Sequence, residues 1–277
     1  MGFFDNLFDK GKSLDQQLIE ECTTACREQR IKDLLNKGAN PNILTNGKKT
    51  PLDYVAEGTL SAVETNPALG LLIERGASVP NNLLATVLYS KRNDWEIAKI
   101  LEFILSKHWS RSLSLKEATA ITVGKNSLPL AELLLKREAP DSSLLAKCPS
   151  VGMANILIKY GASTSFAGPK RATLLMSMIP SGSIDVMEYL IRQGIDVNAV
   201  DEDGNSALMH ACRHYVPNDP VVGTGGLAKL QEACQRIMVQ DRQKLVPMVR
   251  LLLKNGADTA IRNLEGYTAW LFAIVCG

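Results

Sequence analysis

The stretch GSIDVMEYLIRQGIDVN, residues 182–198, decides the fold, because its ending recurs along the chain. The ending consists of two aliphatic residues, Leu190 and Ile191, two polar residues, and then Gly194. The same order ends the stretches 34–42, 71–79, 157–164 and 252–259, and a degenerate copy without the glycine covers 134–140. A glycine at this place takes a left-handed conformation that ends a helix. A helix ending that recurs in this way predicts a repeat architecture.

The spacing and the second half of the unit resemble the ankyrin family. Gly161 and Gly194 lie 33 residues apart, which is the ankyrin period. TPLDY at 50–54 stands where the family has TPLHxA, and DEDGNSAL at 201–208 and NLEGYTAW at 263–270 match DxxGxTPL. The resemblance implies an all-α fold, an ankyrin-type helical solenoid of about seven repeats plus a C-terminal half-repeat. We expect the repeats to span 14–277.

Composition agrees with stacked helices and excludes several kinds of partner. The chain has 277 residues, 45% hydrophobic and only 5% aromatic, which suits small aliphatic cores. Its net charge of +2 gives no field that would attract nucleic acid, so we expect no nucleic-acid partner. No stretch approaches the roughly 20 apolar residues of a membrane span, so we expect no membrane insertion.

The cysteines and the N-terminus indicate a cytoplasmic protein. Six cysteines are scattered without CxxC pairs, and most lie at apolar helical positions, as reduced core thiols do. The N-terminal residues are too few and too acidic for a signal peptide. We interpret residues 1–13 as a capping segment; its apolar face (Phe3, Phe4, Leu7, Phe8) leaves open a membrane-surface or partner-docking peptide.

The individual repeats are expected to differ in regularity. In the first, helices at 14–26 and 28–37 lead to a hairpin in which Asn46-Gly47 supplies the positive φ angles. In the second, Asn66-Pro67 is expected in an extended loop between the helices. The third has helices at 83–91 and 95–107, and the fourth has Glu138 in place of the turn glycine. In the fifth, Cys148-Pro149 is expected to truncate the inner helix.

The seventh repeat carries an insertion, about residues 216–243. The flanking Gly194 and Gly256 are 62 residues apart rather than about 33. The insertion begins with loop-forming residues, and its second half predicts an amphipathic helix whose apolar face contains Leu227, Leu230, Cys234, Ile237 and Met238. It is either a binding surface or a helix that thickens the outer side.

The chain ends inside what should be the first helix of repeat eight, at residues 271–277. We therefore expect it to be part of a longer protein, because no outer helix remains to cover that apolar face. A natural C-terminus that dimerises is the alternative.

No catalytic, metal or cofactor site is predicted. The phrase HACRH, residues 210–214, puts His210 and His214 on one helical face with Cys212 on the other, which leaves two ligands where a metal needs three or four. A Cys-His nucleophile would need an orienting residue and an oxyanion site, and neither can be located. We therefore expect no enzyme; the alternative is the recognition arm of a larger enzyme whose catalytic domain lies beyond residue 277.

The resemblance instead implies a protein–protein interaction module that grips a partner protein or extended peptide on a concave face. We interpret it as a host-targeted effector, which would act in the host cytosol, or a cytosolic adaptor. The charges predict a partner that is acidic toward the N-terminal repeats and basic toward the C-terminal ones. The hairpin tips and inner helices supply the predicted partner-binding residues, namely Lys48, Lys49, Tyr54, Tyr89, Lys91, Arg92, Lys170, Arg171, Glu202, Asp203, Asn205, His210, Arg213, His214, Glu265 and Tyr267.

Asn198 is a predicted modification site. With Leu190, Asp196 and Val197 it resembles the pattern at which ankyrin-like repeats are hydroxylated by an asparaginyl hydroxylase. The alternative interpretation is that Asn198 hydrogen-bonds the turn backbone.

Overall fold

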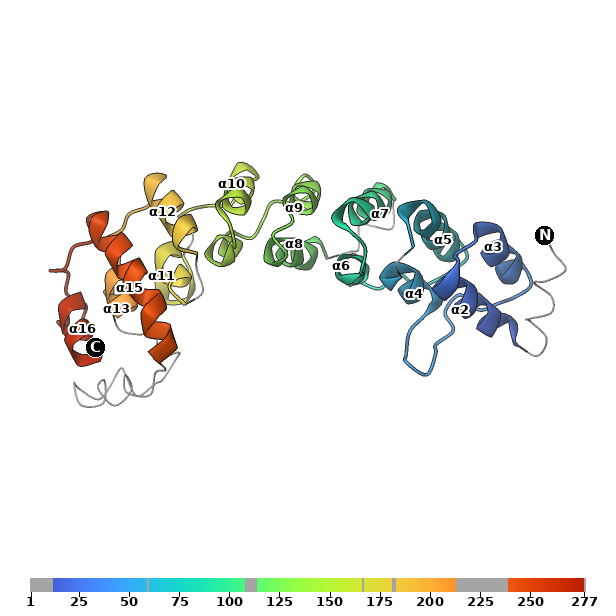
Figure 1. Ribbon diagram of the computed structural model, residues 1–277, viewed down its shortest axis with the longest axis horizontal. Coiled ribbons are helices and arrows are strands. Elements are labelled where there is room, and N and C mark those ends of the chain that lie inside the picture. The colour runs from blue at the N-terminus through green and yellow to red at the C-terminus, as the bar shows by residue number, and fades with distance from the viewer. Residues whose placement is uncertain are drawn as a thin grey trace. The chain divides into compact units, whose positions relative to one another are not determined.

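The structure is a computed structural model that describes residues 12–58, 60–107, 114–165, 167–180, 183–212 and 239–276 (Figure 1). These residues form helices and no strands, which confirms the predicted all-α class. None of the helices in these ranges is long and apolar enough to cross a bilayer. The chain divides into two compact units, Met1–Thr122 with Pro129–Glu138, and Val123–Leu128 with Ala139–Gly277.

The first unit is a series of antiparallel helix pairs, each with an inner and an outer helix. The inner helices α2 (Leu14–Thr24), α4 (Pro51–Glu57) and α6 (Leu83–Tyr89) pack on one another in order, and so do the outer helices α3 (Glu28–Asn36), α5 (Ala62–Glu74) and α7 (Asp94–Ser106). The next pair is α8 (Leu115–Gly124) and α9 (Leu128–Leu135). Fully buried leucines and isoleucines, among them Leu18, Leu52, Leu69, Leu84 and Ile100, fill the layer between the rows.

The second unit repeats this arrangement with shorter inner helices. The inner row consists of the 3₁₀ helix η2 (Ser142–Lys147), α11 (Leu174–Met178), α13 (Ala207–Cys212) and α16 (Ala269–Cys276), which pack in that order. The outer row consists of α10 (Val151–Lys159), α12 (Ile184–Arg192) and α15 (Val239–Lys254). η2 ends just before Cys148-Pro149, as the sequence predicts, because proline cannot continue the helix.

The predicted helix ending is confirmed at every complete copy. Gly38, Gly76, Gly161, Gly194 and Gly256 all have positive φ, between 83° and 102°. In four of them the following alanine N–H reaches back to the carbonyl five residues earlier, as from Ala257 to Leu252 at 3.0 Å. This closes the helix and turns the chain toward the next repeat.

Two local predictions are wrong. In the 45–49 hairpin the left-handed residue is Lys48, with φ of 56°, and neither Asn46 nor Gly47 has positive φ. Pro67 does not lie in a loop but inside α5. The first turn of α5 is held by the Ser61 capping box and by the Ala62 N–H, which donates to Glu96 at 2.5 Å, so the helix forms although Pro67 lacks an N–H.

The structure does not describe two of the predicted segments in full. The undescribed parts are residues 1–11 of the capping segment and residues 213–238 of the insertion, which include its predicted amphipathic helix. The last residues assigned to the insertion, 239–243, are the first turn of α15.

Candidate functional site

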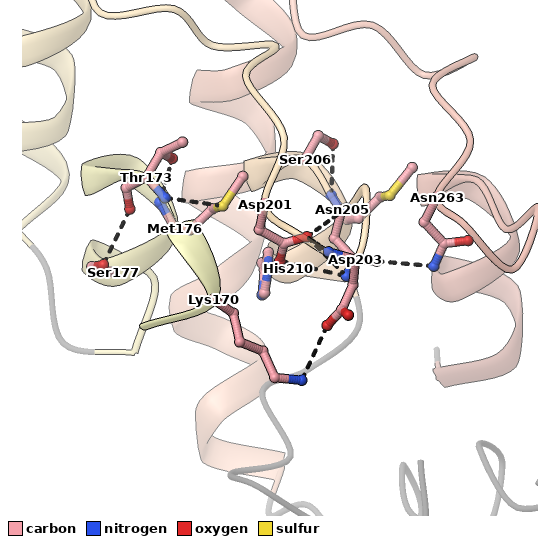
Figure 2. Close-up of polar contacts among 11 residues, drawn as sticks. Lys170, Thr173, Met176, Ser177, Asp201, Asp203, Asn205, Ser206, His210 and Asn263 are labelled. Carbon is pink, nitrogen blue, oxygen red and sulfur yellow. Dashed lines mark hydrogen bonds and ion pairs between the residues drawn. The ribbon is translucent and has the colours of Figure 1, made fainter. Parts of the chain in front are cut away.

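Three hairpin tips of the second unit form the candidate site, which we call the tip ladder: residues 167–173, 200–206 and 262–268 (Figure 2). Each tip closes in the same way, with N–H donors of Gly168, Asp201 and Asn263 bonded to carbonyls four residues later at 2.8–3.0 Å. Gly204 and Gly266 supply the positive φ angle that the second and third tips require.

The first tip reaches a similar shape without glycine. Lys170 and Arg171 both take left-handed conformations, with φ of 54° and 53°. Each such residue costs on the order of 1 kcal/mol, because its Cβ crowds the backbone. Strain of this kind is concentrated at functional sites, and here it presents two exposed cations at the end of a tip.

Backbone hydrogen bonds hold the three tips in register. Glu202 donates its N–H to the Lys170 carbonyl at 2.9 Å, and Leu264 donates to the Asp203 carbonyl at 3.0 Å. The Lys170 ammonium also lies 3.2 Å from the Asp203 carboxylate, both well exposed. The tips therefore form one continuous edge.

A buried polar network lies under the second tip (Figure 2). The Asp201 carboxylate accepts the N–H groups of Asp203 and Asn205 at 3.0 and 2.8 Å, and its other oxygen lies 2.7 Å from Nε2 of His210 on α13. The Asn205 amide accepts a hydrogen bond from Asn263 in the third tip at 3.0 Å. Burial raises the pKa of Asp201, but the hydrogen bonds from His210 and Asn205 outweigh it and leave that pKa below its ordinary value.

The ladder brings together most of the residues predicted for this unit. Lys170, Arg171, Glu202, Asp203 and Glu265 are exposed along its edge. Tyr267 and His210 are half-buried, and the Tyr267 ring meets Phe272 edge-on with centroids 5.9 Å apart. Arg213 and His214 lie outside the described residues.

Asn205 does not face a partner. Its side chain is buried between two tips, where it accepts from Asn263 and lies beside the Asp201 carboxylate. An asparagine four positions after an aspartate in a turn could have suggested this, because both side chains readily bond turn backbone.

Of the partner-binding residues predicted in the first unit, some are exposed and others already interact with side chains of the same unit. Lys48, Tyr89 and Lys91 are exposed. The Tyr54 hydroxyl hydrogen-bonds Thr45 Oγ1 at 3.1 Å, and Lys49 forms an ion pair with Glu57, so both side chains already have partners within the unit.

The prediction that Arg92 contacts a partner is wrong, because its side chain is buried. The guanidinium donates to the carbonyls of Leu60, Ala56 and Val55 at 2.7, 2.6 and 2.9 Å. It thus satisfies the carbonyls at the C-terminus of α4, one repeat earlier in the chain. No sequence pattern near residue 92 predicts this role, because the acceptors of Arg92 lie about 30 residues away in the sequence.

Asn198 joins two consecutive turns. Its amide donates to the Gly256 carbonyl at 3.0 Å and accepts the Asp258 N–H at 2.8 Å. Asn42 does the same with Gly76 and Ser78 in the first unit. The turn hydrogen bond expected as the alternative is therefore present, and hydroxylation stays a prediction.

The described cysteines include Cys212, the thiol considered above for a Cys-His pair. Cys212 is half-buried, and burial raises the pKa of its thiol. Burial also raises the pKa of Cys148 to about 12. Within the described ranges, no group of three or more His, Cys, Asp or Glu side chains could hold a metal ion.

The chain is similar to known proteins that contain ankyrin repeats. Residues 142–222 match the family model described as "Ankyrin repeats (3 copies)". A relative, the "Ankyrin repeat and KH domain-containing protein mask-1" of Caenorhabditis elegans, is 25% identical over 211 residues, which are 71% of this chain and 8% of that protein. Among solved structures, the ankyrin repeat domain of Bcl-3, a member of the IkappaB protein family, is 19% identical with a TM-score of 0.42, covering 95% of this chain and 94% of that one.

Proposed function

We propose that this chain, which contains ankyrin repeats, is a non-catalytic module that binds a partner protein or extended peptide along the tip ladder and the adjoining inner helices. Ankyrin repeats are generally protein–protein interaction modules, so this function rests on the repeats themselves. The finer assignment to the ladder rests on its geometry.

The observation that carries the proposal is the register of the three tips. Backbone bonds from Glu202 to Lys170 and from Leu264 to Asp203 fix the tips as a rigid edge. A rigid edge binds with a smaller loss of conformational entropy than separate loops would. The side chains that point away from these bonds are free to meet a partner.

The charges of the edge specify the partner's chemistry. Arg171 is exposed in the first tip, and Glu202 and Glu265 are exposed in the second and third. A bound segment should place acidic residues at the first tip and basic residues at the other two. We extend the same role to the exposed Lys48, Tyr89 and Lys91 of the first unit, with Tyr89 as an apolar anchor.

We place this activity in the cytoplasm, as an adaptor, or in a host cytosol if the protein is secreted as an effector. The four cysteines that the structure describes, Cys22, Cys26, Cys148 and Cys212, are free, which supports a reducing compartment.

The test begins with a photo-crosslinking pull-down from cell lysate, followed by surface plasmon resonance with the captured partner. Arg171→Glu should lower the association rate on the order of tenfold, because it reverses a rim charge that steers encounter. The matched control is Arg250→Glu, the same change at an exposed arginine of outer helix α15.

Reversal at the other tips, Glu202→Lys with Glu265→Lys, should slow association to a similar degree. Equal binding by all ladder variants and the wild-type chain, together with loss of binding when residues 216–243 are deleted, would show that the insertion is the site and the ladder is not.

A further inference from the structure

We propose that Asn46 is a site of spontaneous deamidation, a modification in which the side-chain carboxamide becomes a carboxylate without an enzyme. The sequence contains two Asn-Gly pairs, Asn46-Gly47 and Asn255-Gly256. The first pair is free to react, whereas the fold protects the second. The chemistry is independent of the proposed function, because it needs only the chain and water.

Deamidation at an Asn-Gly pair involves the backbone nitrogen of the glycine and the carboxamide of the asparagine. The nitrogen gives its proton to solvent and attacks the carboxamide carbon, Cγ. A new C–N bond forms, and the carboxamide C–N bond breaks as its nitrogen takes up a proton and leaves as ammonia, so that a five-membered succinimide ring remains. Water then adds to one of the two ring carbonyl carbons and opens the ring to aspartate or isoaspartate. Glycine favours the attack because it has no Cβ to obstruct it.

Both reacting groups of the first pair are available. Asn46 and Gly47 are exposed in the turn of their hairpin. Within the part of the chain that the structure describes, neither the Asn46 carboxamide nor the Gly47 N–H forms a hydrogen bond. The hairpin is closed instead by the Thr45 N–H, which donates to the Lys49 carbonyl at 3.0 Å, and by the Lys48 N–H, which donates to the Thr45 carbonyl at 2.8 Å. Neither bond uses an atom of the pair, so the attack requires neither of them to break.

Both reacting groups of the second pair are occupied. The Gly256 N–H donates to the Leu253 carbonyl at 3.1 Å, and the Asn255 carboxamide donates to the Leu251 carbonyl at 2.8 Å. These bonds belong to the end of α15, which Gly256 closes with its φ of 83°. The attack on Asn255 therefore requires this helix end to open first, which slows the reaction in proportion to the small population of the open state.

Conversion of Asn46 changes the charge of a predicted binding tip. It places a carboxylate within three residues of Lys48 and Lys49 and lowers the net charge of the chain by one from +2. Lys49 already forms an ion pair with Glu57, so Lys48 is the exposed cation whose charge the new carboxylate offsets. An acidic partner segment should then associate more slowly at this tip. This consequence alone rests on the proposed function.

The experiment is incubation of the purified chain for several weeks at neutral pH and physiological temperature. Proteolysis at mildly acidic pH and mass spectrometry of the peptides that contain Asn46 and Asn255 then measure conversion at each position. Mildly acidic digestion limits further reaction, because the attacking nitrogen must lose a proton. Conversion at Asn46 should be at least about tenfold faster than at Asn255, since only the latter requires local opening. No partner is needed, so a failure of the proposed binding function leaves this result intact.

Gly47→Ala is the matched variant. A Cβ at position 47 would meet only Thr45 Oγ1, at 3.8 Å, and Gly47 does not have positive φ, so the hairpin accepts alanine. The variant should keep the thermal midpoint of the wild-type chain and slow the conversion of Asn46 at least about tenfold, because the Cβ obstructs the attack. In guanidinium chloride, where the chain is unfolded, the two Asn-Gly pairs of the wild-type chain should convert at similar rates.

Equal rates at the two pairs in the folded chain overturn the proposal, and so does the absence of conversion at Asn46. A difference that persists in guanidinium chloride also overturns it, because the flanking sequence and not the fold would then cause the protection. An unchanged rate at Asn46 in folded Gly47→Ala would rule out the attack by the residue 47 nitrogen.

Discussion

Several side chains of this protein act over long sequence separations by binding the backbone of a neighbouring repeat. Arg92 satisfies carbonyls at the end of α4, and Asn198 bridges its own turn and the turn that follows. Both are polar residues of types common at binding surfaces, and both are used here to hold the repeats together. Sequence reasoning alone cannot separate the two uses.

Replacing Arg92 tests its internal role. Arg92→Met keeps much of the apolar stem but removes the guanidinium donors to the carbonyls of Val55, Ala56 and Leu60. Of these, the Leu60 carbonyl still accepts a hydrogen bond from the Thr65 hydroxyl. We expect a loss of about 2 to 4 kcal/mol in the free energy of unfolding, measured by urea titration. The neighbouring exposed Lys91→Met should change it by less than about 0.5 kcal/mol. Similar small effects of both substitutions would show that Arg92 is not a structural residue.

The Asp201 network predicts an acid-dependent contribution to stability. The pKa of Asp201 is lowered in the folded chain, so its ionised form is favoured by folding. The contribution is fully present above the unfolded pKa of about 3.9 and is lost as the pH falls through the folded value. Asp201→Asn should therefore be less stable than the wild-type chain by about 1 to 3 kcal/mol at neutral pH. That gap should narrow on acidification in urea titrations at successive pH values; a constant gap contradicts the assignment.

At the scale of elements, the helix endings and the hairpin tips require glycine for different reasons. Gly194 has φ of 91°, and a Cβ added there meets nothing within 4 Å. Gly204 has φ of 79°, and a Cβ there would lie 3.1 Å from the Asn263 Cα and the Leu264 N. The first position needs glycine only for its conformation, and the second also for the close approach of the next tip.

We therefore expect a glycine-to-alanine substitution to destabilise the chain more at position 204 than at position 194. Gly194→Ala should lower the free energy of unfolding by about 1 to 2 kcal/mol, from backbone strain alone. Gly204→Ala should cost more, about 2 to 4 kcal/mol, because the third tip must also move away. Thermal unfolding of the two variants measures which substitution destabilises the chain more. Gly194→Ala as the more damaging change would mean that the tips are not in contact in solution.

At the scale of the whole chain, stability should be local, because the described helices that pack most closely on one another belong to the same repeat or to consecutive repeats. Leu101 in α7 and Leu190 in α12 are both fully buried, one in each unit. Leu101→Ala should weaken hydrogen-exchange protection in α4–α7 and leave α12 and α15 nearly unchanged, and Leu190→Ala should do the reverse. Each loss should be about 2 to 5 kcal/mol within its own unit. Uniform loss of protection along the chain would contradict a repeat architecture.

The sequence by itself determined the helix endings, the all-α class and the positions of the tips. These features depend on local chemistry, since a left-handed glycine after an aliphatic pair and a Ser or Thr cap act within a few residues. The positive φ at Gly161 and Gly194 and the capping of α11 by Thr173 follow from this. The second and third tips were located by their DxxG phrases for the same reason.

Only the tertiary structure decided which side chains are available to a partner. Arg92 and Asn205 match the types and positions of a binding surface, yet contacts about 30 to 60 residues away bury them. The ion pair between Lys170 and Asp203 likewise depends on how one repeat packs on the next. Burial is a property of packing between repeats, and a local sequence pattern does not contain it.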